Sequence, residues 1–165
     1  MSGFISEHVV IDKGVFIHES VRIYHFTVIR DNVHIGAGSI IGHNVVVERD
    51  TVIGINTTIQ SQCHITAEAV IGDDCFFGPG VIMTNEKNIA NQGRTKAKIE
   101  HAVIGNGVRI GAGAVLAPGV QIGDNAFIHA NAFVTKNIPA CEVWGTPNGK
   151  SRAVKIGMVP ESEWL

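Results

Sequence analysis

Aromatic residues are scarce in this 165-residue chain, at 6% of the sequence, and charged residues reach only 17%. The formal net charge of −2 gives no global argument for binding nucleic acid or an anionic membrane. No apolar run approaches the roughly 20 residues that a membrane-spanning helix needs. The first residues do not combine a basic segment with a hydrophobic one, so we expect no signal peptide. We therefore expect a cytoplasmic protein without nucleic-acid or membrane partners.

Cysteine is also rare. The three cysteines, Cys63, Cys75 and Cys141, are widely spaced and form no CxxC motif. An odd number of cysteines without a secretory signal favours reduced thiols. Cys63 and Cys75 fall at small positions of the repeat described next, so we interpret them as core residues. We expect no metal site.

Glycine, in contrast, is abundant at 19 residues, and 45% of the chain is hydrophobic. Large apolar residues recur at every sixth position from Ile5 to Met83, with a small or β-branched residue four positions after each. An amphipathic helix would show a spacing of about 3.6 residues and a half-buried strand would alternate, so a period of six fits neither. Such a long internal repeat is typical of a solenoid.

The repeat predicts short strands joined by tight turns, with one large and one small side chain pointing inward. Successive coils should stack about 4.8 Å apart, as neighbouring strands do. Glycine often follows the large apolar residue, as in Ile35-Gly36 and Ile53-Gly54. We interpret these glycines as suppliers of turn conformations that a Cβ would penalise.

The period breaks once, after Met83, and resumes at Ile104. The separation of 21 positions from Met83 to Ile104 is not a multiple of six, so we interpret the polar segment 84–98 as an excursion out of the solenoid. Loops that project from rigid scaffolds tend to carry function. We expect one domain over 1–165, made of N-terminal coils (1–83), the excursion loop (84–98), C-terminal coils (99–139), and a closing strand with a short cap (140–165).

The repeat [Ile/Val/Leu]-Gly-x-x-[small]-x resembles the hexapeptide acyltransferases. This resemblance implies an all-β fold, a left-handed parallel β-helix with three hexapeptides per coil, and a homotrimer. Segments 59–85 and 104–150, with "DDCFFGPGVIMTN" and a basic loop after it, look like the nucleotide-sugar N-acetyltransferases. Those enzymes use acetyl-CoA to acetylate an amino group on a UDP- or dTDP-linked deoxyamino sugar, in the synthesis of polysaccharide or glycan precursors.

Acetylation of an amine requires alignment of the amine with the thioester, a donor for the oxyanion and an acceptor for the released proton. The departing thiolate could take that proton, and the excursion contains no histidine, which favours an amine acceptor. The resemblance implies that Ser61 and Gln62 lie beside the sugar amine and that Thr84 and Asn85 lie at the loop entrance. Turn hydrogen bonding is the alternative role for these side chains. We take Gln62 and Asn85, with His64 as a potential base, as the catalytic candidates.

Four further residues are candidates for binding the substrate. His25 matches a segment seen in some relatives, and Arg30 follows it in "IYHFTVIRDN", where an interface ion pair would explain the arginine equally well. Arg94 and Lys96 in the excursion could neutralise a sugar diphosphate, or could simply be solvated.

Acetyl-CoA is the expected co-substrate, and the resemblance places its pantetheine arm in a groove between neighbouring chains, along the later coils. Small residues there would let the arm approach the backbone, although they also suit the turns of the repeat. Basic residues near the C-terminus would meet the phosphates of CoA. The small candidates are Ala112, Gly113 and Ala130, and the basic ones are Lys136, Lys150 and Arg152.

Three alternatives remain open. An O-acetyltransferase would use His64 or His101 as a base for a sugar hydroxyl. A zinc enzyme like the gamma-class carbonic anhydrases needs three converging imidazoles, and that family supplies two of them five residues apart, whereas no two of the eight histidines here have that spacing. A solenoid that only binds a partner is the third.

Overall fold

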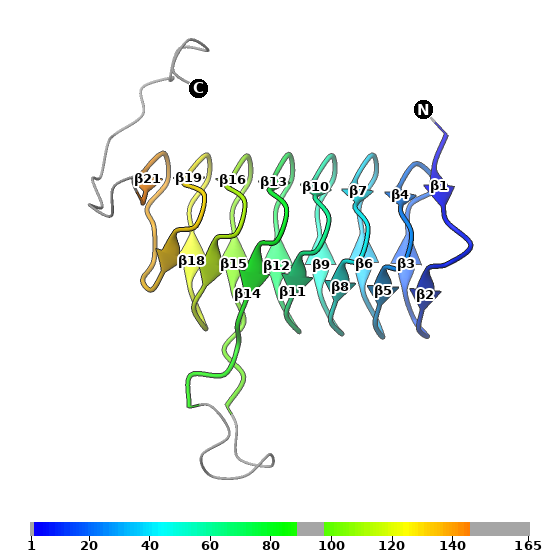
Figure 1. The fold of residues 1–165 in the computed structure, drawn as a ribbon, viewed down its shortest axis with the longest axis horizontal. Helices are drawn as coiled ribbons and strands as arrows, with labels where there is room; N and C mark the ends of the chain where they lie inside the picture. The colour runs from blue at the N-terminus through cyan, green and yellow to red at the C-terminus, as the bar shows by residue number, and fades with distance from the viewer. Residues whose placement is uncertain (1, 89–97, 146–165) are drawn as a thin grey trace.

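The computed structural model describes residues 2–88 and 98–145, and in these residues the chain winds into a parallel β-helix (Figure 1). Every strand is two residues long, and the strands form three sheets along the solenoid axis. Over the same two ranges, the chain contains no helix with the length and apolarity needed to cross a membrane.

The three sheets are the faces of a triangular prism, named here A, B and C. Face A holds β1 (Phe4–Ile5), β4 (Arg22–Ile23), β7 (Ile40–Ile41), β10 (Thr58–Ile59), β13 (Phe76–Phe77), β16 (Arg109–Ile110), β19 (Phe127–Ile128) and β21 (Val143–Trp144). Face B holds β2 (Val10–Ile11), β5 (Val28–Ile29), β8 (Val46–Val47), β11 (His64–Ile65), β14 (Ile82–Met83), β17 (Val115–Leu116) and β20 (Phe133–Val134). Face C holds β3 (Phe16–Ile17), β6 (His34–Ile35), β9 (Val52–Ile53), β12 (Val70–Ile71), β15 (Val103–Ile104) and β18 (Gln121–Ile122).

Each coil visits the three faces in turn, so one coil uses three hexapeptides. Ile5 pairs with Ile23, eighteen residues further along the chain. Across the excursion, Val70 pairs with Val103, 33 residues away, which is 15 more than in an ordinary coil. Segment 84–98 has the same length. The prediction of a parallel β-helix of hexapeptide repeats is confirmed.

The core is a set of vertical stacks inside the prism. From Ile23 onward, the large inward residues of successive coils are almost fully buried. Where the small inward residue carries a hydroxyl group, that group donates a hydrogen bond to a backbone carbonyl, as Thr27 does to Gly42 (2.7 Å) and Thr57 does to Gly72 (2.9 Å). Cys63 and Cys75 occupy the same kind of position and are buried, as predicted.

The first coil differs from the others. Ile5 and Ile11 hold the inward position of the repeat, yet 46% and 41% of their surface is exposed. The reason is that a coil buries its apolar side chains against the coils on both sides of it, and the first coil has a neighbour on one side alone.

The glycines that follow the large apolar residue do not have the role expected of them. Gly36, Gly42, Gly54 and Gly72 are absent from the residues with positive φ. A Cβ added to Gly36 would lie 2.7 Å from the carbonyl carbon of Gly54 in the next coil. These glycines therefore permit close stacking of successive coils, and the turn itself is made elsewhere.

The left-handed turn conformation falls on the second residue of most two-residue turns, with His8 and Ser20 as exceptions. Asparagine and glycine dominate there, for example Asn44 (φ 53°) and Gly113 (φ 68°), because they adopt this region with little strain. The turns stack into three corners. Corner AB joins face A to face B, corner BC joins B to C, and corner CA joins C to A.

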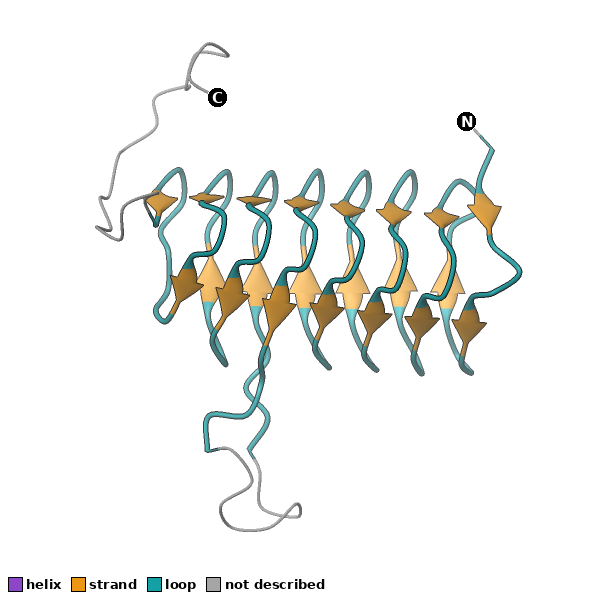
Figure 2. Cartoon of the chain, in the orientation of Figure 1, coloured by secondary structure: helices purple, strands orange, loops and turns teal. Residues whose placement is uncertain are grey.

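The excursion leaves the solenoid after β14 and returns before β15 (Figure 2). Its two described legs meet at an antiparallel bridge between Glu86 and Ile99. At the far end, β21 pairs with β19 on face A. The predicted cap after this strand lies outside the described residues.

Candidate active site at corner AB

Corner AB is built from seven successive turns, each with two residues at its tip. These pairs are 7–8, 25–26, 43–44, 61–62, 79–80, 112–113 and 130–131. Six of the predicted site residues lie on this one corner. They are His25, Ser61, Gln62, Ala112, Gly113 and Ala130.

Ser61 and Gln62 occupy the fourth turn. The backbone amide of His43 donates to Ser61 Oγ (3.2 Å), and the amide of Gln62 donates to the carbonyl of His43 (2.8 Å), so this turn is fixed to the one before it. Gln62 has a left-handed backbone (φ 64°), and its side chain is exposed. Its amide group therefore offers a donor and an acceptor on the outer edge of the corner.

The next two turns carry almost no side chains. A Cβ built on Gly80 would meet no heavy atom of the described chain within 4 Å. In four other turns with a left-handed glycine at this place, an asparagine side chain from the next coil fills the space, as Asn131 does above Gly113. Above Gly80 the next coil presents Gly113 itself. Corner AB therefore has an open strip between Gln62 and Asn131.

His64 lies two residues after Gln62, on β11, and points outward from face B. Its Nε2 is 3.8 Å from Oε1 of Glu48, on the neighbouring coil. The imidazole is about half exposed. An imidazole beside a carboxylate is the arrangement that general-base catalysis uses.

Four other predicted residues lie at the opposite edge of face B, next to corner BC. Arg30 forms an ion pair with Asp12 (3.0 Å), and Thr84 Oγ1 donates to the carbonyl of Leu116 (2.9 Å). Asn85 is the second residue of the excursion, and its carbonyl accepts from the amide of Glu100. Lys136 lies over the ring of Trp144, 4.8 Å from its centroid. Within one chain, face B separates these residues from corner AB.

Arg94, Lys96, Lys150 and Arg152 lie outside the described residues, so the predicted phosphate contacts in the loop and near the C-terminus stay predictions.

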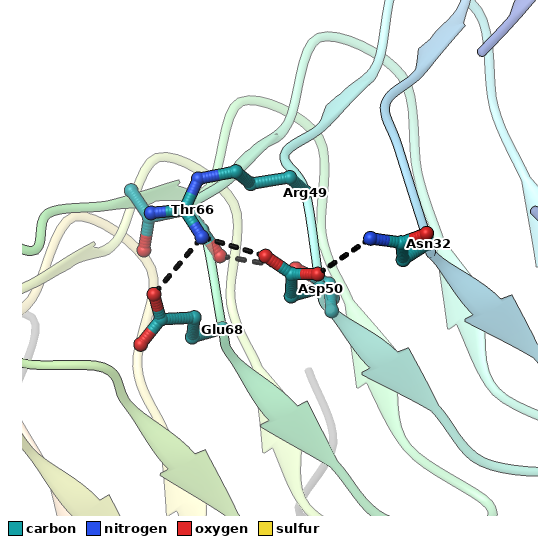
Figure 3. Close-up of polar contacts among 6 residues, drawn as sticks. Asn32, Arg49, Asp50, Thr66 and Glu68 are labelled. Carbon is teal, nitrogen blue, oxygen red and sulfur yellow. Dashed lines mark hydrogen bonds and ion pairs between the residues drawn. The ribbon is translucent and has the colours of Figure 1, made fainter. Parts of the chain in front are cut away.

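Corner BC carries a ladder of charged and polar side chains (Figure 3). Arg49 contacts Asp50 (2.6 Å) and Glu68 (3.0 Å), and Asn32 donates to Asp50 (3.0 Å). The hydrogen bond from Asn32, followed by that from Arg49, lowers the pKa of the Asp50 carboxyl. In this ladder Arg49 is paired with two carboxylates and Asp50 with two donors, so we interpret it as a surface that stabilises the fold.

The buried thiols are poor nucleophiles. Burial raises the pKa of Cys63 to about 11, and burial also raises the pKa of Cys75. A thiol reacts through its thiolate, so neither residue would be reactive at neutral pH. Over residues 2–88 and 98–145, no group of three His, Cys, Asp or Glu side chains is placed to hold a metal ion.

Sequence reasoning selected His25 and missed the rings around it. His8, Phe26 and His43 lie on the same corner as His25, and Tyr24 lies immediately before it. The missed signal was the period of a whole coil, because His8 and Phe26 are eighteen residues apart, as are His25 and His43.

Residues 14–49, 50–85 and 101–136 match the sequence model of a family described as bacterial transferase hexapeptide (six repeats), and together they make up well over half of the chain. Over 77 residues, the chain is 39% identical to the bifunctional protein GlmU of Streptococcus uberis. That match covers 46% of this chain and 15% of GlmU, so the chain spans only a small part of this relative.

Two solved structures have a similar fold. One is a hexapeptide-repeat acetyltransferase of Vibrio cholerae in complex with acetyl-CoA, with a TM-score of 0.63 and 23% identity over 74% of this chain and 72% of that one. The other is a GDP-perosamine N-acetyltransferase variant of Caulobacter crescentus with CoA and GDP-perosamine, with a TM-score of 0.51 and 19% identity over 92% of this chain and 57% of that one. At these identities the likeness concerns the fold alone.

Proposed function

Since this chain belongs to the bacterial transferase hexapeptide family, we propose that it transfers the acetyl group of acetyl-CoA to the amino group of a nucleotide-linked deoxyamino sugar. The observation that carries the proposal is the order of residues along corner AB. Gln62, a candidate for holding the acceptor, is followed by the open space at Gly80, which suits a thin pantetheine arm.

In the proposed reaction, the amine nitrogen attacks the thioester carbonyl carbon, a C–N bond forms and the C–S bond breaks. The exposed amide of Gln62 accepts a hydrogen bond from the amine and so directs its lone pair at the carbonyl. The proton leaves the nitrogen for the departing thiolate, and the products are the acetamido sugar and CoA. No strong base is needed, because a neutral amine is already a good nucleophile.

We further propose that the working unit is a homotrimer, in which the excursion of one chain meets corner AB of its neighbour. Asn85 and Gln62 lie at opposite edges of face B in one chain, so an interface between chains is the route by which both could reach one substrate. In the two solved structures above, the same fold holds acetyl-CoA or CoA, and in one of them also a nucleotide sugar.

The test is release of the free CoA thiol from acetyl-CoA with a panel of UDP-, dTDP- and GDP-linked 3-amino and 4-amino sugars, and with the matching hydroxyl sugars as controls. Turnover confined to amino sugars supports the proposal. Turnover with hydroxyl sugars alone contradicts it.

We expect Gln62→Ala to lower kcat for the amino sugar by about 10-fold to 100-fold, as loss of an aligning hydrogen bond does. Because the Gln62 side chain is exposed, the melting temperature should stay within about 2 °C of the wild type. Ser20→Ala, at corner CA, is a matched polar control and should leave kcat unchanged. Wild-type kcat in Gln62→Ala would remove this residue from the site.

O-acetylation of a sugar hydroxyl is the second candidate, and the contact between His64 and Glu48 favours it. A hydroxyl needs a general base, so His64→Asn should then abolish turnover, and Glu48→Gln should reduce it. With an amine acceptor, both variants should keep most of the wild-type kcat.

A further inference from the structure

The beginning of corner AB carries five aromatic rings from three successive coils. His25 stacks on His43 with ring centroids 5.5 Å apart and planes 21° from parallel. His8 lies 5.7 Å from His25 and 5.2 Å from Phe26, and Tyr24 lies 5.1 Å from His43. Three of the chain's eight histidines therefore lie together with a tyrosine and a phenylalanine immediately before the turn that holds Gln62.

Phe26 is the unusual member of this group. It occupies the left-handed position of its turn (φ 62°), where the later turns of corner AB have Asn44, Gln62, Gly80 and others. A bulky residue is strained in this region, and such strain tends to persist where function requires it. The side chain gains little from burial in return, because 62% of it is exposed.

The ring of His25 is held in place by a residue of the preceding coil. Ser6 is buried, and its hydroxyl is hydrogen-bonded to Nδ1 of His25, which fixes the plane of that imidazole. His25 is only partly buried and Phe26 is exposed, so a ligand can reach both rings. A flat aromatic ligand with polar edges fits both, since it can stack on Phe26 and hydrogen-bond at an imidazole edge.

We propose that Phe26, with His25 and His43 beside it, is the platform on which the nucleobase of the substrate stacks. This inference rests on the proposed function for the identity of the ligand. The turn with Gln62 lies two coils further along the corner than Phe26, or about 10 Å at about 4.8 Å per coil. The ribose, the diphosphate and the sugar would span this distance, which places the amine beside Gln62.

The test compares three variants. Phe26→Asn introduces the residue that the next turn uses at the same place (Asn44), so it should fold at least as well as the wild type. Phe26→Ala and Phe16→Ala form a matched pair, because Phe16 is 60% exposed and also lies near an imidazole (His34, 5.9 Å), but on face C. Melting temperatures of all three variants verify folding.

Binding of UDP, dTDP and GDP is measured by calorimetry. We expect both Phe26 variants to raise the Kd of the preferred nucleoside diphosphate about tenfold, as loss of base stacking does. Phe16→Ala should leave that Kd unchanged. For the nucleotide-linked amino sugar, the same Phe26 variants should raise KM and leave kcat close to wild type.

The outcomes separate this inference from the proposed function. Nucleoside diphosphate binding that is absent in the wild type, or unchanged in both Phe26 variants, overturns the platform even if amino sugars are acetylated. An equal loss of affinity for the amino sugar 1-phosphate, which has no base, would put the sugar at Phe26 and also overturn it. Phe26-dependent binding of a nucleoside diphosphate without acetylation of any amino sugar would support the platform and contradict the proposed function.

Discussion

Two buried threonines inside the solenoid differ in whether their hydroxyl groups are hydrogen-bonded. Thr57 Oγ1 donates to the carbonyl of Gly72 (2.9 Å) and accepts from the amide of Cys75 (3.0 Å). Thr66 Oγ1 is equally inaccessible, yet it has no hydrogen-bond partner among the described residues. A buried polar group without a partner is destabilising, whereas a paired one is not.

We therefore expect Thr57→Val and Thr66→Val to have opposite effects. Thr57→Val leaves an amide and a carbonyl in the core without their partner and should lower the free energy of unfolding by about 1–3 kcal/mol. Thr66→Val removes an unpaired hydroxyl group and should leave that free energy unchanged or raise it by up to about 1 kcal/mol. Urea unfolding of both variants measures the difference, and equal destabilisation would contradict this account.

The raised pKa of Cys63 makes stability depend on pH in the alkaline range. In the folded chain the thiol keeps its proton up to a pKa of about 11, whereas its ordinary value is 9.0. Between these pH values the unfolded state binds fewer protons, so the free energy of unfolding should fall with rising pH, by up to about 1.4 kcal/mol per pH unit. Below pH 8 the contribution is complete.

The measurement is urea unfolding of the wild type and of Cys63→Ala from pH 7.5 to 10.5. The alanine variant should lose less stability over this range than the wild type does. Parallel curves for the two proteins would show that Cys63 does not titrate as expected.

At the scale of the repeat, glycine has two separate roles. Gly36 lies against the backbone of the next coil, whereas Gly80 has a left-handed backbone (φ 70°) and open space around it. A Cβ added at Gly36 would force the coils apart. A Cβ added at Gly80 would contact no neighbouring coil, so its only cost would be the strain of a left-handed backbone.

We expect Gly36→Ala to lower the free energy of unfolding by about 3 kcal/mol or more, because backbone atoms cannot move aside cheaply. Gly80→Ala should lower it by about 1–2 kcal/mol, the strain of a left-handed alanine. Chemical unfolding of the two variants measures which of them loses more free energy of unfolding. A larger loss for Gly80→Ala would mean that strain outweighs the close approach of the coils. If corner AB binds CoA, Gly80→Ala should also raise the KM for acetyl-CoA.

The repeat could be predicted from the sequence because every coil repeats the same large and small inward positions. The period of six gave the core and the place of the excursion. It did not give the role of Gly36, since a glycine needed for close approach and one needed for a positive φ look alike in sequence. The rings of corner AB were also missed, because neighbours on a corner are eighteen residues apart and His25 was considered alone.

The candidate site was partly predictable for the same reason. Ser61, Gln62, Ala112 and Gly113 lie on one corner because they hold the same place in different coils. Asn85 was grouped with Gln62 by resemblance, but within one chain face B separates the two. A pattern within one chain carries no information on which residues a neighbouring chain would bring closer.

For the whole molecule, the outer surface of face B is the most uniformly apolar. Its outward residues are Val10, Val28, Val46, His64, Ile82, Val115 and Phe133. Face A, in contrast, presents Arg22, Thr58 and Arg109 among its outward residues. Six of these seven outward residues are apolar. An exposed apolar surface of this kind is typical of an interface between chains, so we assign the proposed trimer contact to face B.

Ile82→Lys should therefore dissociate the trimer, since it would bury a charge in the contact. Phe76→Lys is the matched control, because Phe76 is 38% exposed on face A and Ile82 is 45% exposed on face B. Light scattering coupled to size exclusion should give one-third of the trimer mass for Ile82→Lys and the full mass for Phe76→Lys. A trimer that survives Ile82→Lys would move the contact to another face.

In uninterrupted parts of the solenoid each strand residue pairs with the one eighteen positions away, so distances along a corner come in fixed steps of one coil. Inserting or deleting eighteen residues would change the separation of two groups on a corner by one step and leave them on that corner. A change of six residues would keep the repeat in frame but rotate everything beyond it by one face, so that Gln62 and Phe26 would point in different directions. Chains of this architecture can therefore adapt to longer or shorter ligands only by whole coils, that is, in steps of about 4.8 Å.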